Sequence, residues 1–159
     1  MKDHITINNE IELSYPENFY PMETDELRKY FSSVKNRTGF RNAEHNMIIS
    51  IGWTEPLNIF TSLLVDERSY IKGYDKRISK ALKNYTRGET VSKQICGRTA
   101  EGFSYSFDAS DTGAPHRGMI VAVRCGKRIF IAEYTTSCGD RLFCSMAFNM
   151  VIASMRIMQ

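Results

Sequence analysis

The sequence predicts one α+β domain over residues 1–159, in which a mostly antiparallel sheet is sandwiched by helices on both faces. Three observations lead to this three-layer α/β/α architecture. The chain has the length of an ordinary single domain, with 42% hydrophobic and 25% charged residues, close to the globular average. Residues 118–135 form two apolar strands joined by a very short turn. Amphipathic helical segments are available to cover both sides of that ribbon.

The apolar ribbon consists of strands expected at 118–125 and 128–135. They are joined by Gly126-Lys127, a two-residue loop that suits a primed hairpin turn. If Cys125 pairs with Arg128, alternate side chains lie on opposite faces of the sheet. One face then carries Val121, Val123, Phe130, Ala132 and Tyr134, and the other carries Ile120, Ala122, Ile129 and Ile131. Both faces are apolar, so both must be covered.

The first half of the chain predicts a hairpin, a helix and a strand. Residues 5–7 and 11–15 flank Asn8-Asn9 as a small hairpin. A helix capped by Thr24 or Asp25 follows, with apolar residues at helical spacing: Leu27, Tyr30, Phe31 and Val34. Gly39 lies beyond the end of this helix. Residues 47–53, dense in isoleucine, form a strand.

The second half predicts a long helix, a strand meander and a final helix. The long helix spans about 60–85, and Gly73 is the point where it bends or divides. Its expected buried stripe is Leu64, Ile71, Tyr74, Ile78, Leu82 and Tyr85. Strands at 90–96 and 102–108 precede the apolar ribbon, and the final helix runs from about Asp140 to Ser154.

The N-terminus lacks the apolar region of a signal peptide, and the longest apolar runs are too short to span a bilayer. Of the four cysteines, Cys96, Cys125 and Cys144 sit in or beside apolar runs, whereas Cys138 is the one expected at the surface. The even number leaves disulfides open, but a reduced, cytoplasmic protein is the preferred interpretation. The cysteine and histidine spacing fits no zinc site, so no metal and no cofactor are expected.

The most polar connection in the meander runs from residue 108 to 117 and is the candidate ligand site. Its candidate binding residues are Asp108, Asp111, His116 and Arg117. Two carboxylates, an imidazole and a guanidinium suit an anion, a metal or another small ligand. Their spacing matches no EF-hand loop, and aspartate, glycine and proline are also ordinary turn residues. No nucleophile has a base placed beside it, so no catalytic residue is assigned.

A basic stripe lies on the long helix and is a second candidate surface: Lys72, Lys76, Lys80, Lys83 and Arg87. Such a stripe could hold phosphates, an anionic membrane surface or an acidic partner, or it could be the solvated outer face of the helix. Nucleic acid is not the expected partner, because the formal net charge is only +3 and no aromatic residues are interleaved to stack bases.

The final helix is apolar nearly all round, which makes it the candidate interface. One row (Phe143, Ala147, Met150) can face the sheet. A second row then needs its own cover: Cys144, Phe148, Val151 and Met155. Either a neighbouring strand or loop supplies that cover, or a partner does, such as a second copy of the chain.

The element order resembles the PsbP-like fold, which is shared by an extrinsic photosystem II subunit, a Ran-binding nuclear import factor and small bacterial proteins. Four segments carry the resemblance, and together they spread over most of the chain: residues 11–19, 49–53, 101–107 and 152–157. It is a pattern of strands and aromatic residues, not a catalytic signature. The resemblance implies a non-enzymatic binding or assembly module. A small-molecule, anion or metal-binding protein that uses the 108–117 loop is the alternative.

Overall fold

The protein is described from a computed structural model, which defines residues 4–137 and 139–158; Cys138 lies outside the described residues. The strands are β1 His4–Ile7, β2 Ile11–Ser14, β3 Tyr20–Pro21, β4 Arg37–Asn42, β5 Met47–Trp53, β6 Lys83–Ile95, β7 Arg98–Asp108, β8 Pro115–Cys125, β9 Arg128–Thr136 and β10 Arg156–Ile157. The helices are α1 Thr24–Tyr30, α2 Ile59–Leu64, α3 Glu67–Ala81 and α4 Arg141–Ser154.

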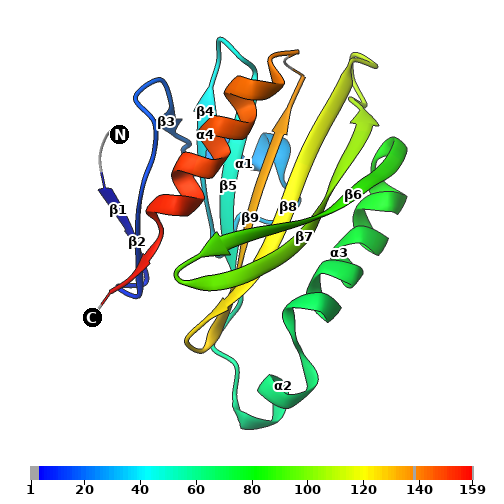
Figure 1. Ribbon diagram of the computed structural model, residues 1–159. Helices are drawn as coiled ribbons and strands as arrows, with labels where there is room; N and C mark the ends of the chain where they lie inside the picture. The colour runs from blue at the N-terminus through cyan, green and yellow to red at the C-terminus, as the bar shows by residue number, and fades with distance from the viewer. Residues whose placement is uncertain (1–3, 138, 159) are drawn as a thin grey trace.

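The main sheet has seven strands in the order β3-β4-β5-β9-β8-β7-β6, and every neighbouring pair is antiparallel. A second, three-stranded sheet has the order β1-β2-β10 and brings the two ends of the described chain together (Figure 1). The predicted α+β class with a large antiparallel sheet is confirmed.

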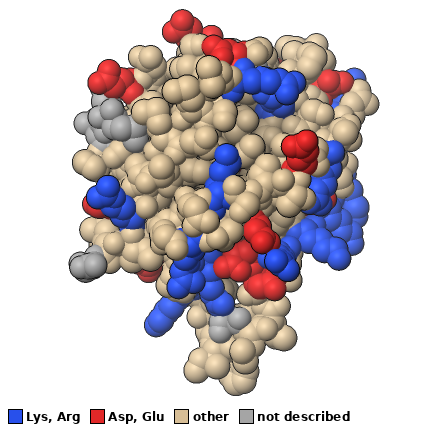
Figure 2. All heavy atoms as spheres, viewed as in Figure 1, with Lys and Arg blue, Asp and Glu red and all other residues tan. Residues whose placement is uncertain are grey.

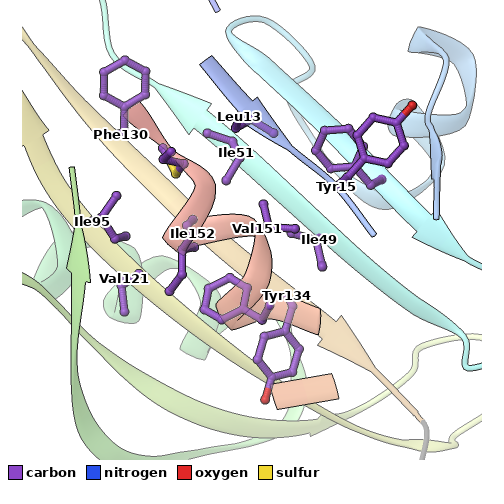
Figure 3. Close-up of a cluster of buried hydrophobic side chains, with 14 of the residues drawn as sticks. Leu13, Tyr15, Ile49, Ile51, Ile95, Val121, Phe130, Tyr134, Val151 and Ile152 are labelled. Carbon is purple, nitrogen blue, oxygen red and sulfur yellow. The ribbon is translucent and has the colours of Figure 1, made fainter. Parts of the chain in front are cut away.

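The apolar ribbon lies inside the main sheet in the predicted register, with Cys125 opposite Arg128. Its first face packs in one core cluster with α4 and the small sheet. Figure 3 shows Val151 and Ile152 of α4 between Val121 and Ile49 of the sheet. Its second face packs under α3, where Ile71 is buried. Helices therefore cover both faces of the ribbon, as its two apolar sides require.

The second row of α4 is covered by the chain itself, and this corrects the predicted interface. Cys144, Phe148, Val151 and Met155 are only 0–3% exposed. They pack against the sheet, as the tilted ring pair Phe148–Tyr134 shows with centroids 5.0 Å apart. The large apolar residues of α4 that face outward are Leu142, Met146 and Met150. Any partner of this helix would therefore meet a different row from the one predicted.

The long helix predicted at 60–85 is two helices followed by a strand. The break falls at Val65-Asp66, because the Asp66 carboxylate accepts a hydrogen bond from the Ser69 backbone N–H at 2.8 Å and starts α3 anew. Gly73 does not divide the helix; it lies inside α3. Lys83 and Arg87 belong to β6, so the predicted basic stripe does not continue along one helix.

Further differences concern short elements. The strand β4 was not predicted, although Gly39 lies within it, and neither was β10 at the end of the chain. The helix at residue 24 is confirmed but ends at Tyr30, and its N-cap is Glu23, whose side chain makes no capping hydrogen bond. Among the described residues, no helix has both the length and the apolar character needed to cross a bilayer.

Candidate functional site

The side chains of the predicted ligand loop hydrogen-bond within and beside their own hairpin. Asp108 accepts a hydrogen bond from the Asn84 side chain at 2.7 Å, and Asp111 accepts one from the Thr112 backbone at 2.8 Å. His116 packs its ring 5.4 Å from Phe107, and Arg117 is half-buried in β8. No group of three potential metal ligands occurs in the part of the chain that the structure describes. A ligand role for this loop stays a prediction.

The predicted basic stripe is divided between α3 and β6. Lys72, Lys76 and Lys80 are exposed at four-residue spacing on α3. Arg87 on β6 is bound internally, because its guanidinium pairs with Asp75 of α3 at 3.0 Å and lies 4.7 Å from the centre of the Phe103 ring. Binding of a polyanion by this surface also stays a prediction.

A buried polar cluster that the sequence analysis missed lies between α3 and the sheet, and we call it the Glu133 cluster. The Glu133 carboxylate on β9 is only 6% exposed. It accepts hydrogen bonds from the Tyr74 hydroxyl of α3 at 2.6 Å and from the Tyr105 hydroxyl of β7 at 3.1 Å. Arg37 of β4 reaches the same region and donates to the Ser50 hydroxyl at 3.0 Å. The cluster thereby links helix α3 to strands β4, β5, β7 and β9.

The electrostatics of the Glu133 cluster favour a structural role. Burial raises the pKa of Glu133, an effect opposed by the hydrogen bond from Tyr74 and by the charge of Arg37. Burial also raises the pKa of both tyrosines, and the negative charge of Glu133 raises it further. Both hydroxyls therefore stay protonated, and neither can act as a general base. The carboxylate is closed to solvent and hydrogen-bonded on both oxygens, so it fixes α3 to the sheet.

The raised pKa of Glu133 predicts a specific pH dependence of stability. The ordinary pKa of a glutamate carboxyl group is 4.5. As pH rises above this value, Glu133 ionises in the unfolded state before it ionises in the folded state. The free energy of unfolding therefore falls as pH rises from 4.5 through the folded-state pKa. Glu133→Gln removes this titration, so the variant should gain stability relative to the wild type as pH increases. Urea unfolding between pH 4.5 and 8 measures this difference.

The control for this experiment is Glu89→Gln, because Glu89 is exposed on β6 and solvent screens its charge. With rising pH, the stability gained by Glu133→Gln should exceed any change seen in this control. A Glu133→Gln variant that gains no more stability than the control would contradict the assignment. The sequence did contain one signal for this cluster: Glu133 is a charged residue within a strand whose two faces are apolar.

Among the residues that the structure describes, helix α2 carries the most exposed large apolar side chains, and we call these four side chains the α2 patch. Ile59, Phe60, Leu63 and Leu64 are each 77–82% exposed. Leu64 had been predicted to be buried. Figure 1 shows α2 beyond the end of the main sheet, and Figure 2 shows the described atoms of that projection without charged side chains.

The α2 helix is held at both ends, so its exposure is built into the fold. The Asn58 side chain and Thr61 form a reciprocal cap at its start. The Leu57 backbone N–H donates to the Lys127 carbonyl in the β8–β9 turn at 2.7 Å. Leu57 and Val65, one on each side of α2, pack against the core cluster beneath α3. The patch is therefore presented on an anchored segment.

Comparison with known proteins rests on structure, since neither a protein-family model nor a curated protein sequence matches the chain. The solution structure of cyanobacterial PsbP (CyanoP) from Synechocystis superposes with a TM-score of 0.63 at 12% identity, covering 98% of this chain and 91% of that one. The chain has a PsbP-like fold. This confirms the resemblance predicted from the strand and aromatic pattern.

Other solved structures share the PsbP-like fold. LpqN of Mycobacterium tuberculosis, described as involved in cell envelope biogenesis, has a TM-score of 0.60 at 12% identity over 94% of this chain and 83% of its own. A protein of Bacteroides thetaiotaomicron has a TM-score of 0.59 at 12% identity over 94% of this chain, which spans 45% of that longer protein. Identities this low establish the fold alone.

Proposed function

We propose that this PsbP-like chain is a non-enzymatic binding and assembly module that self-associates through the α2 patch. The observation that carries the proposal is the concentration of Ile59, Phe60, Leu63 and Leu64 at 77–82% exposure on one short, anchored helix. Single exposed apolar residues are common on protein surfaces, but a contiguous group of this size marks an interaction site.

Charge supports a protein partner over an anionic membrane. Residues 56–65 contain no charged side chain, and the exposed acids Glu55 and Asp66 border them on both sides. Residues 56–65 therefore offer anionic lipid headgroups no lysine or arginine to bind, and Lys35 beside them lies 3.5 Å from the Glu55 carboxylate.

The size of the patch supports a second copy as that partner. The four side chains present roughly 500–600 Å² of apolar surface, at the upper end for a monomer. Pairing two such patches about a two-fold axis buries roughly 1,000–1,200 Å², which is enough for a weak, specific contact.

Self-association is tested with Phe60→Ser combined with Leu63→Ser, which leaves the cap residues Asn58 and Thr61 in place. We expect the wild type to dimerise in the micromolar range and the double variant to stay monomeric. Its free energy of unfolding should change by less than about 0.5 kcal/mol, because both side chains are exposed. Light scattering and sedimentation over a concentration series measure the association. A wild type that is monomeric throughout the series would contradict the proposal.

The outward row of α4 is the second candidate for the same contact. Leu142, Met146 and Met150 are 70%, 55% and 42% exposed at four-residue spacing. Met146→Ser combined with Met150→Ser is therefore the matched variant for the α2 experiment. Dimers that persist in this variant but not in the α2 variant support the α2 patch. The reverse result would move the interface to α4, the helix favoured by the sequence analysis.

A further inference from the structure

Two cysteine thiols meet at one end of the main sheet. Cys96 directly follows the last residue of β6, and Cys125 is the last residue of β8. The strand between them, β7, begins at Arg98, which pairs with Ile95 across the β6–β7 turn. Continuing the β7–β8 register places the same Arg98 beside Cys125. Ile95 and Cys125 therefore flank Arg98, and Cys96 is the next residue after Ile95. Cys96 packs against the core cluster that contains Cys125, so the two side chains interact at this end of the sheet.

The backbone at Cys96 is unusual for a cysteine. Six non-glycine residues of the described chain have positive φ, and five of them are asparagines: Asn8, Asn9, Asn36, Asn46 and Asn84. The sixth is Cys96, with φ 53°, followed by Gly97 with φ 73°. A two-residue hairpin turn with two positive φ angles favours Asn-Gly. The backbone therefore gives no reason for cysteine at this position, whereas the neighbouring thiol does.

The two thiols differ in access. Cys96 is half-buried and lines a surface hollow of about 550 Å³, together with Gln94, Met155 and Ile157. Cys125 is 4% exposed. The hydrogen bond from Cys125 lowers the pKa of Cys96, and the same bond, together with burial, raises the pKa of Cys125. A small reagent can therefore reach Cys96 but not Cys125, and Cys96 is also the thiol that ionises more easily to the reactive thiolate.

We propose that Cys96 and Cys125 form a reversible disulfide in the folded protein, with a low-molecular-weight disulfide as the oxidant. The Cys96 thiolate attacks one sulfur of that reagent, forms a mixed disulfide and releases one thiolate, which takes up a proton. Cys125 then loses its proton and attacks the Cys96 sulfur, which releases the second small thiol. The protein loses two hydrogen atoms, and the small disulfide is reduced to two thiols.

The link would join the β6–β7 turn to the end of β8. Because it closes a loop in the unfolded chain, it should raise the Tm relative to the reduced protein. This inference does not depend on self-association through the α2 patch.

The test exposes the reduced full-length chain to glutathione disulfide under native conditions. Free thiols are then alkylated, and the intact mass and the linked peptides are measured. We expect the loss of two hydrogen atoms, a peptide linking Cys96 to Cys125 and a Tm several degrees higher. Cys125→Ala should stop the reaction at a glutathione adduct on Cys96. Cys96→Asn should give no link and keep the fold, because asparagine suits the turn.

Cys144→Ala and Cys138→Ser are the control variants, and both should still form the link. Three outcomes would overturn the proposal. These are a link that requires Cys138, a stable glutathione adduct on Cys96 of the wild type, and an unreacted Cys96.

Discussion

The substitution Gly102→Ala is expected to destabilise the folded protein strongly. Gly102 lies in β7 opposite Val121 of β8, and a Cβ atom at this position would lie 1.7 Å from the Ile120 carbonyl oxygen and 2.7 Å from the Ile120 carbonyl carbon. These are backbone atoms of the central ribbon, so no side-chain rotation relieves the clash. We expect a loss of at least about 3–4 kcal/mol, a large share of the 5–15 kcal/mol typical of a domain. Urea unfolding followed by circular dichroism measures it.

The matched control for this glycine is Gly73→Ala. Gly73 lies inside α3, and a Cβ atom there meets no atom within 4 Å. Alanine at a helix-interior site should stabilise the protein by about 0.5–1 kcal/mol. A folded Gly102→Ala variant of wild-type stability would contradict the close approach of β7 and β8.

The substitution Phe148→Asp is expected to unfold the protein, although the sequence suggested Phe148 as an interface residue. Phe148 is 1% exposed and packs against Tyr134 in the core under α4. Removing a buried phenylalanine side chain lowers the free energy of unfolding by about 3–5 kcal/mol. The new carboxylate would also be buried among apolar side chains, which costs further stability. Loss of the cooperative unfolding transition, together with aggregation, is the expected result.

Met146→Asp provides the comparison on the same helix. Met146 is 55% exposed on the outward row of α4, so the aspartate remains in water and the fold should survive. If Phe148→Asp were folded and merely monomeric, the burial of the second α4 row would be wrong and the interface predicted from the sequence would be restored.

Several parts of the fold could be predicted because they depend on neighbours in the sequence. The register between Cys125 and Arg128 follows from the two-residue turn between them. The final helix starts where it was predicted, because Asp140 caps α4 by accepting a hydrogen bond from the Phe143 backbone at 2.9 Å. The break at Asp66 was missed because the apolar spacing of residues 60–85 continues across it, and a local cap outweighed that spacing.

The functional surfaces were predicted less well, because burial depends on contacts between distant elements. A row such as Cys144 and Phe148 has the same sequence pattern whether a strand or a partner covers it. Leu64 fits an amphipathic helix, yet the end of the sheet leaves no neighbour to bury it. Glu133 stood out in its strand, but its tyrosine partners come from α3 and β7, far away along the chain.

The sequence by itself determined the three-layer architecture, because alternation along 118–135 makes both faces of the ribbon apolar, and both must be shielded from water. The tertiary structure alone decided which helix faces are shielded, that α2 projects uncovered and that Cys96 meets Cys125. The physical reason is that strand alternation is a property of consecutive residues. Exposure and thiol contact instead depend on how separate strands and helices are placed in space.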